Sequence, residues 1–210
     1  MIRLRRQDAD EGKYYNMKVL GITGGVGSGK SRVLDYLEEA YGAVICRMDD
    51  TARELQQKGT RCFERIVDTF GPGILSADGE LDRTALGALA FSDDKKLREL
   101  NAIVHPEVIR EVRQRIRECE ERGCPLFVVE SALLPDVGRE LCDELWYIYA
   151  DEEVRRHRLR ASRGYTDEKI TQMIASQPGE EQFRAACAVV IDNSGDFEDT
   201  MRQIGEHLKR

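Results

Sequence analysis

The stretch from Lys18 to Ser31, KVLGITGGVGSGKS, decides the fold of this chain. Its first part, Lys18–Thr23, is a short apolar run that leads into glycines, a pattern typical of a buried parallel strand entering a tight turn. The following segment, Ser31–Tyr41, places apolar residues at helical spacing, and Gly42 stands where a helix C-cap is expected. Strand, glycine-rich loop and helix in this order predict a phosphate-binding loop.

The chemistry of such a loop follows from its residues. Residues 24–31 match the pattern G-x-x-x-x-G-K-[ST], in which glycines let successive backbone N–H groups face one anionic centre at a helix N-terminus. Lys30 can reach the β- and γ-phosphates of ATP, and Ser31 can ligate Mg²⁺. The alternative is a glycine-rich turn without a ligand. We assign ATP binding to Gly24, Gly25, Val26, Gly27, Ser28, Gly29, Lys30 and Ser31, with ATP and Mg²⁺ as the implied cofactors.

The remaining apolar runs predict the rest of a sheet. Four further short runs follow the first one, at Ala43–Cys46, Leu126–Val129, Leu145–Ala150 and Ala188–Ile191. Strands separated by helical segments indicate an α/β fold, a P-loop NTPase-type parallel sheet with helices on both faces.

Two helical segments stand apart from this alternation. The stretch between the second and third strands reads as helical, with breaks at residues 71–73 and 77–79, and is too long for one crossover. It predicts a helical substrate-binding lobe over about 50–123. An arginine-rich helix, Asp151–Arg163, is followed by a turn at Gly164 and a helix capped by Thr166, which predicts a short helical lid over about 151–177.

Composition excludes several classes of protein. With 41% hydrophobic and 34% charged residues and no apolar run near the ~20 residues of a spanning helix, we expect neither disorder nor a membrane protein. A net charge of -7 disfavours nucleic-acid binding. Six cysteines without a C-x-x-C pair indicate neither a zinc site nor a disulfide framework, and they suit a cytoplasmic location. No obligate protein partner is evident.

The first residues differ from the rest of the chain. Residues 1–16 carry no apolar core of a secretory signal, and the first predicted strand begins only after Met17. We expect residues 1–16 to be either a polar, largely disordered extension without a function or the result of a misplaced start, and residues 17–210 to form the P-loop kinase domain.

Other motifs separate a small-molecule kinase from a GTPase. Two D-x-x-G matches exist, Asp68–Gly71 and Asp192–Gly195, but the sequence has no N-K-x-D guanine-reading motif. The chain is short for a mechanical ATPase, and the strand-end segment LFVVE places only one carboxylate, Glu130. A small-molecule kinase fits best.

From Met17 onward the sequence resembles the dephospho-CoA kinase family. The resemblance is carried by five segments in order, at Thr23–Ser31, Asp49–Leu55, Phe70–Arg83, Leu100–Pro106 and Val190–Gly195. It implies an ATP-dependent phosphotransferase that phosphorylates the 3′-hydroxyl of dephospho-CoA, giving coenzyme A and ADP. The alternatives are a P-loop nucleotide-binding regulatory protein without transfer activity, and a kinase for another small nucleoside-like substrate.

The resemblance implies that Asp49 is the base that accepts the hydroxyl proton. The family usually shows D-A-D at this point, whereas this chain reads CRMDD from Cys46 to Asp50. The first aspartate is missing, and a one-residue uncertainty in register keeps Asp50 as a second candidate. Alternatively, Asp49 only caps the helix that follows.

Glu130 lies where the family has the aspartate of a D-x-P-L-L motif, here ESALL. A carboxylate at this strand end could serve Mg²⁺ through water, or simply end the strand.

Three arginines of the lid helix, Arg156, Arg160 and Arg163, are spaced to share one face. Such a stripe could clamp phosphates when a lid closes, or form a solvated face paired with acidic residues. Register with the family leaves only Arg163 as the candidate catalytic arginine, because its other possible position is Ser162.

Three more residues take candidate roles from the resemblance. Asn193 corresponds to a residue near the adenine base, with simple turn chemistry as the alternative. His105 and Arg83 are candidate substrate-binding residues of the helical lobe. A structural His beside Pro106 in a first helical turn, and a surface salt bridge of Arg83, are the alternatives.

Overall fold

The computed structural model describes residues 17–132, 134–137 and 140–209. Its centre is one sheet of five parallel strands in the order β2-β3-β1-β4-β5. The strands are β1 (Lys18–Thr23), β2 (Val44–Arg47), β3 (Leu126–Glu130), β4 (Glu144–Tyr149) and β5 (Val189–Asp192). The predicted α/β parallel sheet is confirmed, and the strand bounds agree with the five apolar runs to within a residue or two.

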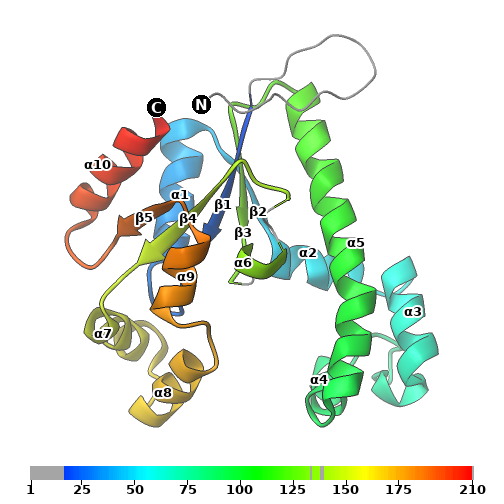
Figure 1. Cartoon of the computed structure of the whole chain (residues 1–210). Coiled ribbons are helices and arrows are strands. Elements are labelled where there is room, and N and C mark those ends of the chain that lie inside the picture. The colour runs from blue at the N-terminus through cyan, green and yellow to red at the C-terminus, as the bar shows by residue number, and fades with distance from the viewer. Residues whose placement is uncertain (1–16, 133, 138–139, 210) are drawn as a thin grey trace.

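Helices cover both faces of the sheet because successive strand residues are buried on opposite sides. Val19, Phe127 and Val129 belong to one hydrophobic cluster, whereas Leu20 and Val128 belong to another. This double burial makes the strands almost continuously apolar. The second cluster includes residues of α1 (Lys30–Tyr41) and α10 (Phe197–Leu208), and the first includes residues of α5 (Asp94–Glu121) on the other face (Figure 1).

The long stretch between β2 and β3 is helical, as the sequence predicts. It contains α2 (Met48–Leu55), α3 (Arg61–Phe70), the 3-10 turn η1 (Pro72–Ile74), α4 (Arg83–Phe91) and α5. Figure 1 shows α3 and α4 at the end of α5 that is far from the sheet. Side chains of α3, α4 and α5 join the same hydrophobic cluster as Phe127 and Val129 of β3.

One sequence expectation for this region is wrong. Pro106 does not lie in a first helical turn but inside the 28-residue helix α5. Proline has no backbone N–H, so the carbonyl of Ala102 four residues earlier loses its usual helical donor. The helix nevertheless continues, because its buried residues on both sides of this point pack into one core, from Ile103 to Cys119.

After β3 come α6 (Leu134–Val137) and β4, and after β4 come α7 (Glu152–Arg163), α8 (Asp167–Ala175) and α9 (Glu180–Ala186). As predicted, Gly164 ends α7 with a left-handed backbone, and the Thr166 side chain caps α8 by accepting from the N–H of Lys169. Helix α9 packs on β4 through Phe183, whose ring stacks on Tyr147 at a centroid distance of 4.9 Å. In the described part of the chain, no helix has the length and apolar character needed to cross a membrane. Residues 1–16, the predicted extension, lie outside the described residues.

Candidate active site

The phosphate loop lies between the carboxyl end of β1 and the first turn of α1. At Gly29 the backbone is left-handed, with φ of 86°, and a Cβ atom there would lie 2.3 Å from Nδ2 of Asn193. A glycine is therefore required at this position both by the backbone conformation and by the neighbouring side chain.

Inside the loop, the Ser28 hydroxyl is buried and has no hydrogen-bond partner among the described residues. Buried hydroxyls in proteins are normally paired, so this one points to a partner that protein atoms do not supply. The Ser28 carbonyl, in contrast, accepts hydrogen bonds from Asn193 Nδ2 at 2.7 Å and from Arg158 Nη1 at 3.3 Å.

Lys30, the first residue of α1, turns its side chain back over the loop. Its Nζ donates to the Gly24 carbonyl at 2.7 Å and lies 3.9 Å from Oε1 of Glu130. Burial lowers the pKa of Lys30, the Glu130 carboxylate opposes this, and the nearby Arg155 guanidinium lowers the pKa further. The ammonium is thus held in a partly desolvated place where an anion would stabilise it.

Glu130 ends β3 and supplies a carboxylate to the same place. Its side chain is 16% exposed, and burial raises its pKa, with Lys30 opposing the shift and Asp49 adding to it. Ser31, the second residue of α1, lies on the neighbouring element and is exposed. The Ser31 hydroxyl and the Glu130 carboxylate both lie at the carboxyl end of the parallel strands, and both are oxygen ligands of the kind that Mg²⁺ prefers. Mg²⁺ usually completes its coordination shell with water and substrate phosphates.

The two candidate bases, Asp49 and Asp50, both lie in the first turn of α2, and among the described residues only Asp50 forms an ion pair. Asp50 pairs with Arg53 at 2.9 Å on the helix surface. Asp49 acts electrostatically on both Lys30 and Glu130. The N-cap of α2 is Arg47, so the alternative that Asp49 caps the helix is wrong.

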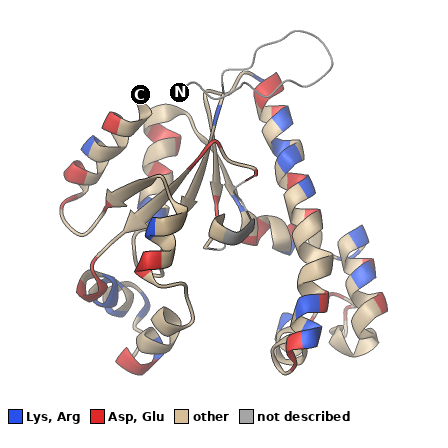
Figure 2. Ribbon diagram, in the orientation of Figure 1, with Lys and Arg blue, Asp and Glu red and all other residues tan. Residues whose placement is uncertain are grey.

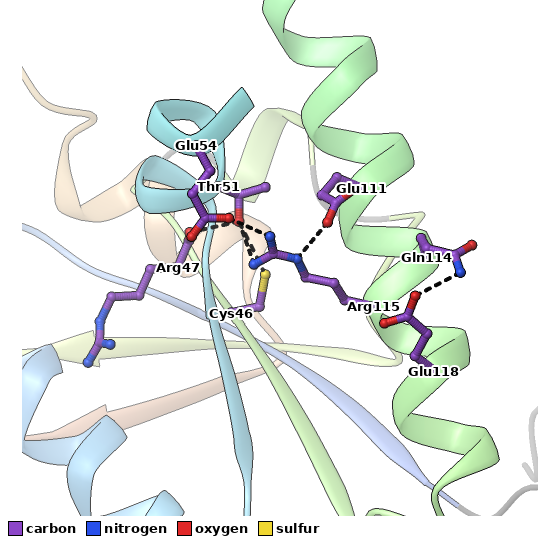
Figure 3. A network of polar contacts seen from close by, with 8 residues as sticks. All are labelled: Cys46, Arg47, Thr51, Glu54, Glu111, Gln114, Arg115 and Glu118. Atoms are coloured by element: carbon purple, nitrogen blue, oxygen red, sulfur yellow. Dashed lines mark hydrogen bonds and ion pairs between the residues drawn. The ribbon is translucent and has the colours of Figure 1, made fainter. Parts of the chain in front are cut away.

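Helix α2 is itself held in place by a polar network that the sequence did not reveal (Figure 3). Arg115 of α5 contacts Glu54 at 2.5 Å and Glu111 at 2.9 Å, and its Nη1 lies 3.5 Å from Oγ1 of Thr51. The Thr51 hydroxyl is also 3.6 Å from Sγ of Cys46. The contacts of Arg115 with Glu54 and Thr51 could not be predicted from the sequence, because they join distant segments, whereas the Arg115–Glu111 pair has the four-residue spacing of neighbours on a helix.

The arginine stripe predicted on α7 does not face the phosphate loop. Arg156 pairs with Glu152 at 2.8 Å and donates to Thr171, and Arg160 pairs with Asp167 at 2.8 Å. Two of its three members therefore follow the alternative reading, a face paired with acidic residues, and they tie α7 to α8. Arg163 is exposed at the end of α7.

Two other arginines of α7 reach the loop instead, and the sequence interpretation missed them. Nε of Arg155 donates to the Val26 carbonyl at 2.8 Å, and Nη1 of Arg158 donates to the Ser28 carbonyl at 3.3 Å. Within the described helix α7, Leu159 is the one buried residue, and it marks the inward side of the helix. Five of the twelve residues of α7 are arginine, and Figure 2 shows the resulting basic colouring of this helix.

Asn193 follows β5 and lies against the phosphate loop. It is 2% exposed, and besides its bond to Ser28 its Oδ1 accepts from the Thr200 hydroxyl at 3.0 Å. The structure thus gives the side chain more than a local turn role. A contact with adenine stays a prediction.

The candidate substrate residues lie in the helical segment. Arg83 begins α4 and donates to the Gln56 side chain at 3.3 Å and to the Arg53 carbonyl at 3.2 Å, so its described contacts are not those of a surface salt bridge. His105 is half-buried in α5, next to Pro106. Roles of these two residues in substrate binding stay predictions.

The chain is similar to known proteins along most of its length. The family model described as "Dephospho-CoA kinase" matches residues 18–199. The chain is 40% identical over 190 residues to a dephospho-CoA kinase of Carboxydothermus hydrogenoformans, covering 90% of this chain and 91% of the relative. It is 39% identical to one of Geobacter sulfurreducens, covering 90% and 96%.

Solved structures share the fold. A crystal structure from Thermus thermophilus has a TM-score of 0.76 and 29% identity, covering 92% of this chain and 97% of that chain. A dephospho-CoA kinase from Campylobacter jejuni has a TM-score of 0.65 at 18% identity, covering 91% and 95%, and is similar in fold alone. With a phosphate loop at the carboxyl end of a five-stranded parallel sheet and a family match along nearly the whole described chain, this protein belongs to the dephospho-CoA kinase family.

Proposed function

We propose that this chain transfers the γ-phosphate of ATP to the 3′-hydroxyl of the ribose of dephospho-CoA, the last step of coenzyme A biosynthesis. The observation that carries the proposal is the meeting of Lys30, Glu130 and Asp49 beside the phosphate loop, in a member of this family. Three elements contribute one charged side chain each, at the edge where ligands of parallel sheets bind.

Asp49 is the proposed proton acceptor. The ribose oxygen forms a bond to the γ-phosphorus while the bond from that phosphorus to the β–γ bridging oxygen breaks, and ADP leaves. The hydroxyl proton passes to the Asp49 carboxylate. Lys30, held at the loop, balances the negative charge of the β- and γ-phosphates during this transfer.

Ser31 and Glu130 are the proposed residues for Mg²⁺, Ser31 directly and Glu130 through water. When bound, the ion neutralises charge on the phosphate oxygens. The buried Ser28 hydroxyl, unpaired among the described residues, supports the assignment of the loop as an oxyanion site.

The helical lobe, about 50–123, and the lid, about 151–177, are the proposed substrate-covering parts. Arg83 and His105 are the candidate contacts in the lobe, Arg163 is the candidate catalytic arginine of the lid, and Asn193 is the candidate residue near adenine. The proposed partners are small molecules, ATP and dephospho-CoA, and a cytoplasmic location stays a prediction.

The proposal is tested by incubating the purified chain with Mg-ATP and dephospho-CoA and separating the products. We expect coenzyme A and ADP in equal amounts, and neither when the Lys30→Met variant replaces the protein. Product formation no greater than that of a no-enzyme control would reject the proposed function and favour a nucleotide-binding regulatory protein. Phosphorylation of a different nucleoside-like alcohol in the same assay would instead change only the substrate.

A further inference from the structure

Arg155, near the start of α7, is one of the two arginines of this helix whose side chains contact the phosphate loop. Its Nε donates to the Val26 carbonyl at 2.8 Å. A Cβ atom on Gly25 would lie 2.5 Å from its Nη2 and 2.7 Å from its Cζ, so the guanidinium is packed against the loop backbone. The next residue, Arg156, points away and pairs with Glu152.

The charge of Arg155 has no carboxylate partner within residues 17–132, 134–137 and 140–209. No ion pair of that part of the chain includes it, whereas Arg156 and Arg160 are both paired. Arg158 also reaches the loop, but it donates through both terminal nitrogens, to the carbonyls of Ser28 and Asn193. Arg155 uses only Nε, so among the described contacts its two terminal nitrogens remain available.

A second cation lies at the same place. Lys30 is close enough to Arg155 for the two charges to repel each other, and the carboxylates that act on Lys30 are those of Glu130 and Asp49. Arg155 thus adds a positive charge beside a loop whose backbone N–H groups already favour an anion.

The segment that carries Arg155 is fixed to the loop at both ends. While Arg155 holds the Val26 carbonyl, Oε1 of Gln177, two residues beyond the end of α8, accepts from the Val26 N–H at 2.8 Å. Both backbone polar groups of Val26 are therefore hydrogen-bonded to the segment that runs from α7 to Gln177. This arrangement keeps the guanidinium in register with the loop.

We propose that Arg155 binds the β- and γ-phosphates of ATP together with Lys30, as a phosphate-binding arginine of the lid. The Nε bond to Val26 fixes the plane of the guanidinium and leaves Nη1 and Nη2 to contact phosphate oxygens, a geometry that suits arginine better than lysine. The position expected from the family resemblance, Ser162 or Arg163, lies at the far end of α7. The Ser162 hydroxyl is bonded to the Arg158 carbonyl within the helix. The inference rests on the proposed function for the identity of the nucleotide.

The test compares Arg155→Met, Arg155→Lys and the matched control Arg156→Met by calorimetric titration with Mg-ATP, alongside turnover of dephospho-CoA. Losing charge-assisted hydrogen bonds should raise the Kd for Mg-ATP roughly 10- to 100-fold in Arg155→Met and lower turnover. Arg155→Lys should regain part of the affinity, because it keeps the charge. Arg156→Met should bind Mg-ATP within about twofold of the unaltered chain, a difference well under the factor of 10 that 1.4 kcal/mol represents.

Two results would overturn the inference. One is unchanged Mg-ATP affinity in Arg155→Met. The other is an equal loss in Arg155→Met and Arg155→Lys, which would mean that Arg155 acts only by holding the Val26 carbonyl. Failure of the proposed function would look different, since an unaltered chain that binds Mg-ATP but does not phosphorylate dephospho-CoA leaves the binding comparison intact.

Discussion

The side-chain amide of Asn193 donates a hydrogen bond of 2.7 Å to the backbone carbonyl of Ser28, across a sequence separation of 165 residues. The bond joins the turn after β5 to the phosphate loop after β1, although β4 lies between these two strands in the sheet. The Thr200 hydroxyl of α10 donates a hydrogen bond to Oδ1 of the same Asn193 side chain. The shape of the loop therefore depends on a part of the chain close to its C-terminus.

Asn193→Ala should destabilise both the fold and the nucleotide site. Two buried hydrogen bonds are lost, so we expect the free energy of unfolding to fall by about 1–3 kcal/mol, together with a loss of ATP affinity. Thermal unfolding and calorimetric titration measure the two effects. If the residue serves only to contact adenine, the affinity would fall while the melting temperature stayed unchanged.

Lys30→Met should abolish transfer without destabilising the fold. Burial lowers the pKa of Lys30, so the folded state holds this proton less tightly than the unfolded state, and the buried ammonium opposes folding at neutral pH. Removing the charge should leave the melting temperature of the nucleotide-free protein unchanged or slightly higher. A marked drop in melting temperature, or retained turnover, would contradict this assignment.

Asp49→Asn should lower turnover by the ~10²- to 10⁴-fold typical of a lost general base, with little change in ATP affinity. Asparagine keeps the size of the side chain but cannot take the proton. The matched control is Asp50→Asn, which breaks only the surface pair with Arg53 and should keep most of the turnover. Inactivity of the Asp50 variant and activity of the Asp49 variant would exchange the two roles.

Glu130→Gln should raise the Mg²⁺ concentration needed for half-maximal turnover, because a carboxamide is a weaker ligand than a carboxylate for Mg²⁺ and its waters. If Glu130 merely ends β3, the Mg²⁺ dependence would not move. Titrating turnover against free Mg²⁺ at saturating ATP separates these outcomes.

The same variant also gives a pH-dependent effect on stability. Burial raises the pKa of Glu130 in the folded state, so folding takes up a proton and stability falls as pH rises from the ordinary glutamate range through the raised value. At pH values above the raised pKa of Glu130, the melting temperature of Glu130→Gln should be equal to or higher than that of the unaltered chain. At more acidic pH, where Glu130 is protonated, we expect this difference in melting temperature to disappear. Melting curves of both proteins at a series of pH values measure this difference. A variant that is less stable than the unaltered chain only above the raised pKa would contradict the prediction.

The fold could be predicted because its signals are local. Each strand is a short apolar run, and the phosphate loop is set by glycines and Lys30 within one stretch of sequence. Strand boundaries differ from the predicted ones by one residue, as at β2, because hydrogen bonding to β3 rather than hydrophobicity decides where that strand begins and ends.

The lid was harder to predict, because spacing shows which residues share a helix face but not where that face points. Arg156 and Arg160 do share a side, but it is the side toward α8. The inward direction is set by Leu159, which is 3% exposed, and Arg155 lies one helical turn before it. If the inward face of α7 had been assigned from Leu159, the sequence would have predicted that Arg155 faces the phosphate loop.

Contacts between distant segments were not predictable from one sequence. The ion pair between Arg115 and Glu54 and the hydrogen bond from Asn193 to Ser28 each join two elements that are distant in sequence. The relative position of these elements is defined only in the folded chain. Pro106 was misplaced for a related reason, since tertiary packing along α5 outweighs the local preference of proline for a first turn.

The shared hydrophobic cluster has a consequence for cooperativity. Ile66 of α3, Leu86 of α4 and Val108 of α5 are buried in the same cluster as Phe127 of β3. Helix α5 spans about 42 Å at the usual rise per residue. No separate core exists in the described chain on which the helical segment could melt alone while the sheet persisted. We therefore expect one unfolding transition, with equal calorimetric and van't Hoff enthalpies. Destabilising substitutions of buried residues in α3 or α4 would then lower the free energy of unfolding of the whole chain, including the phosphate loop.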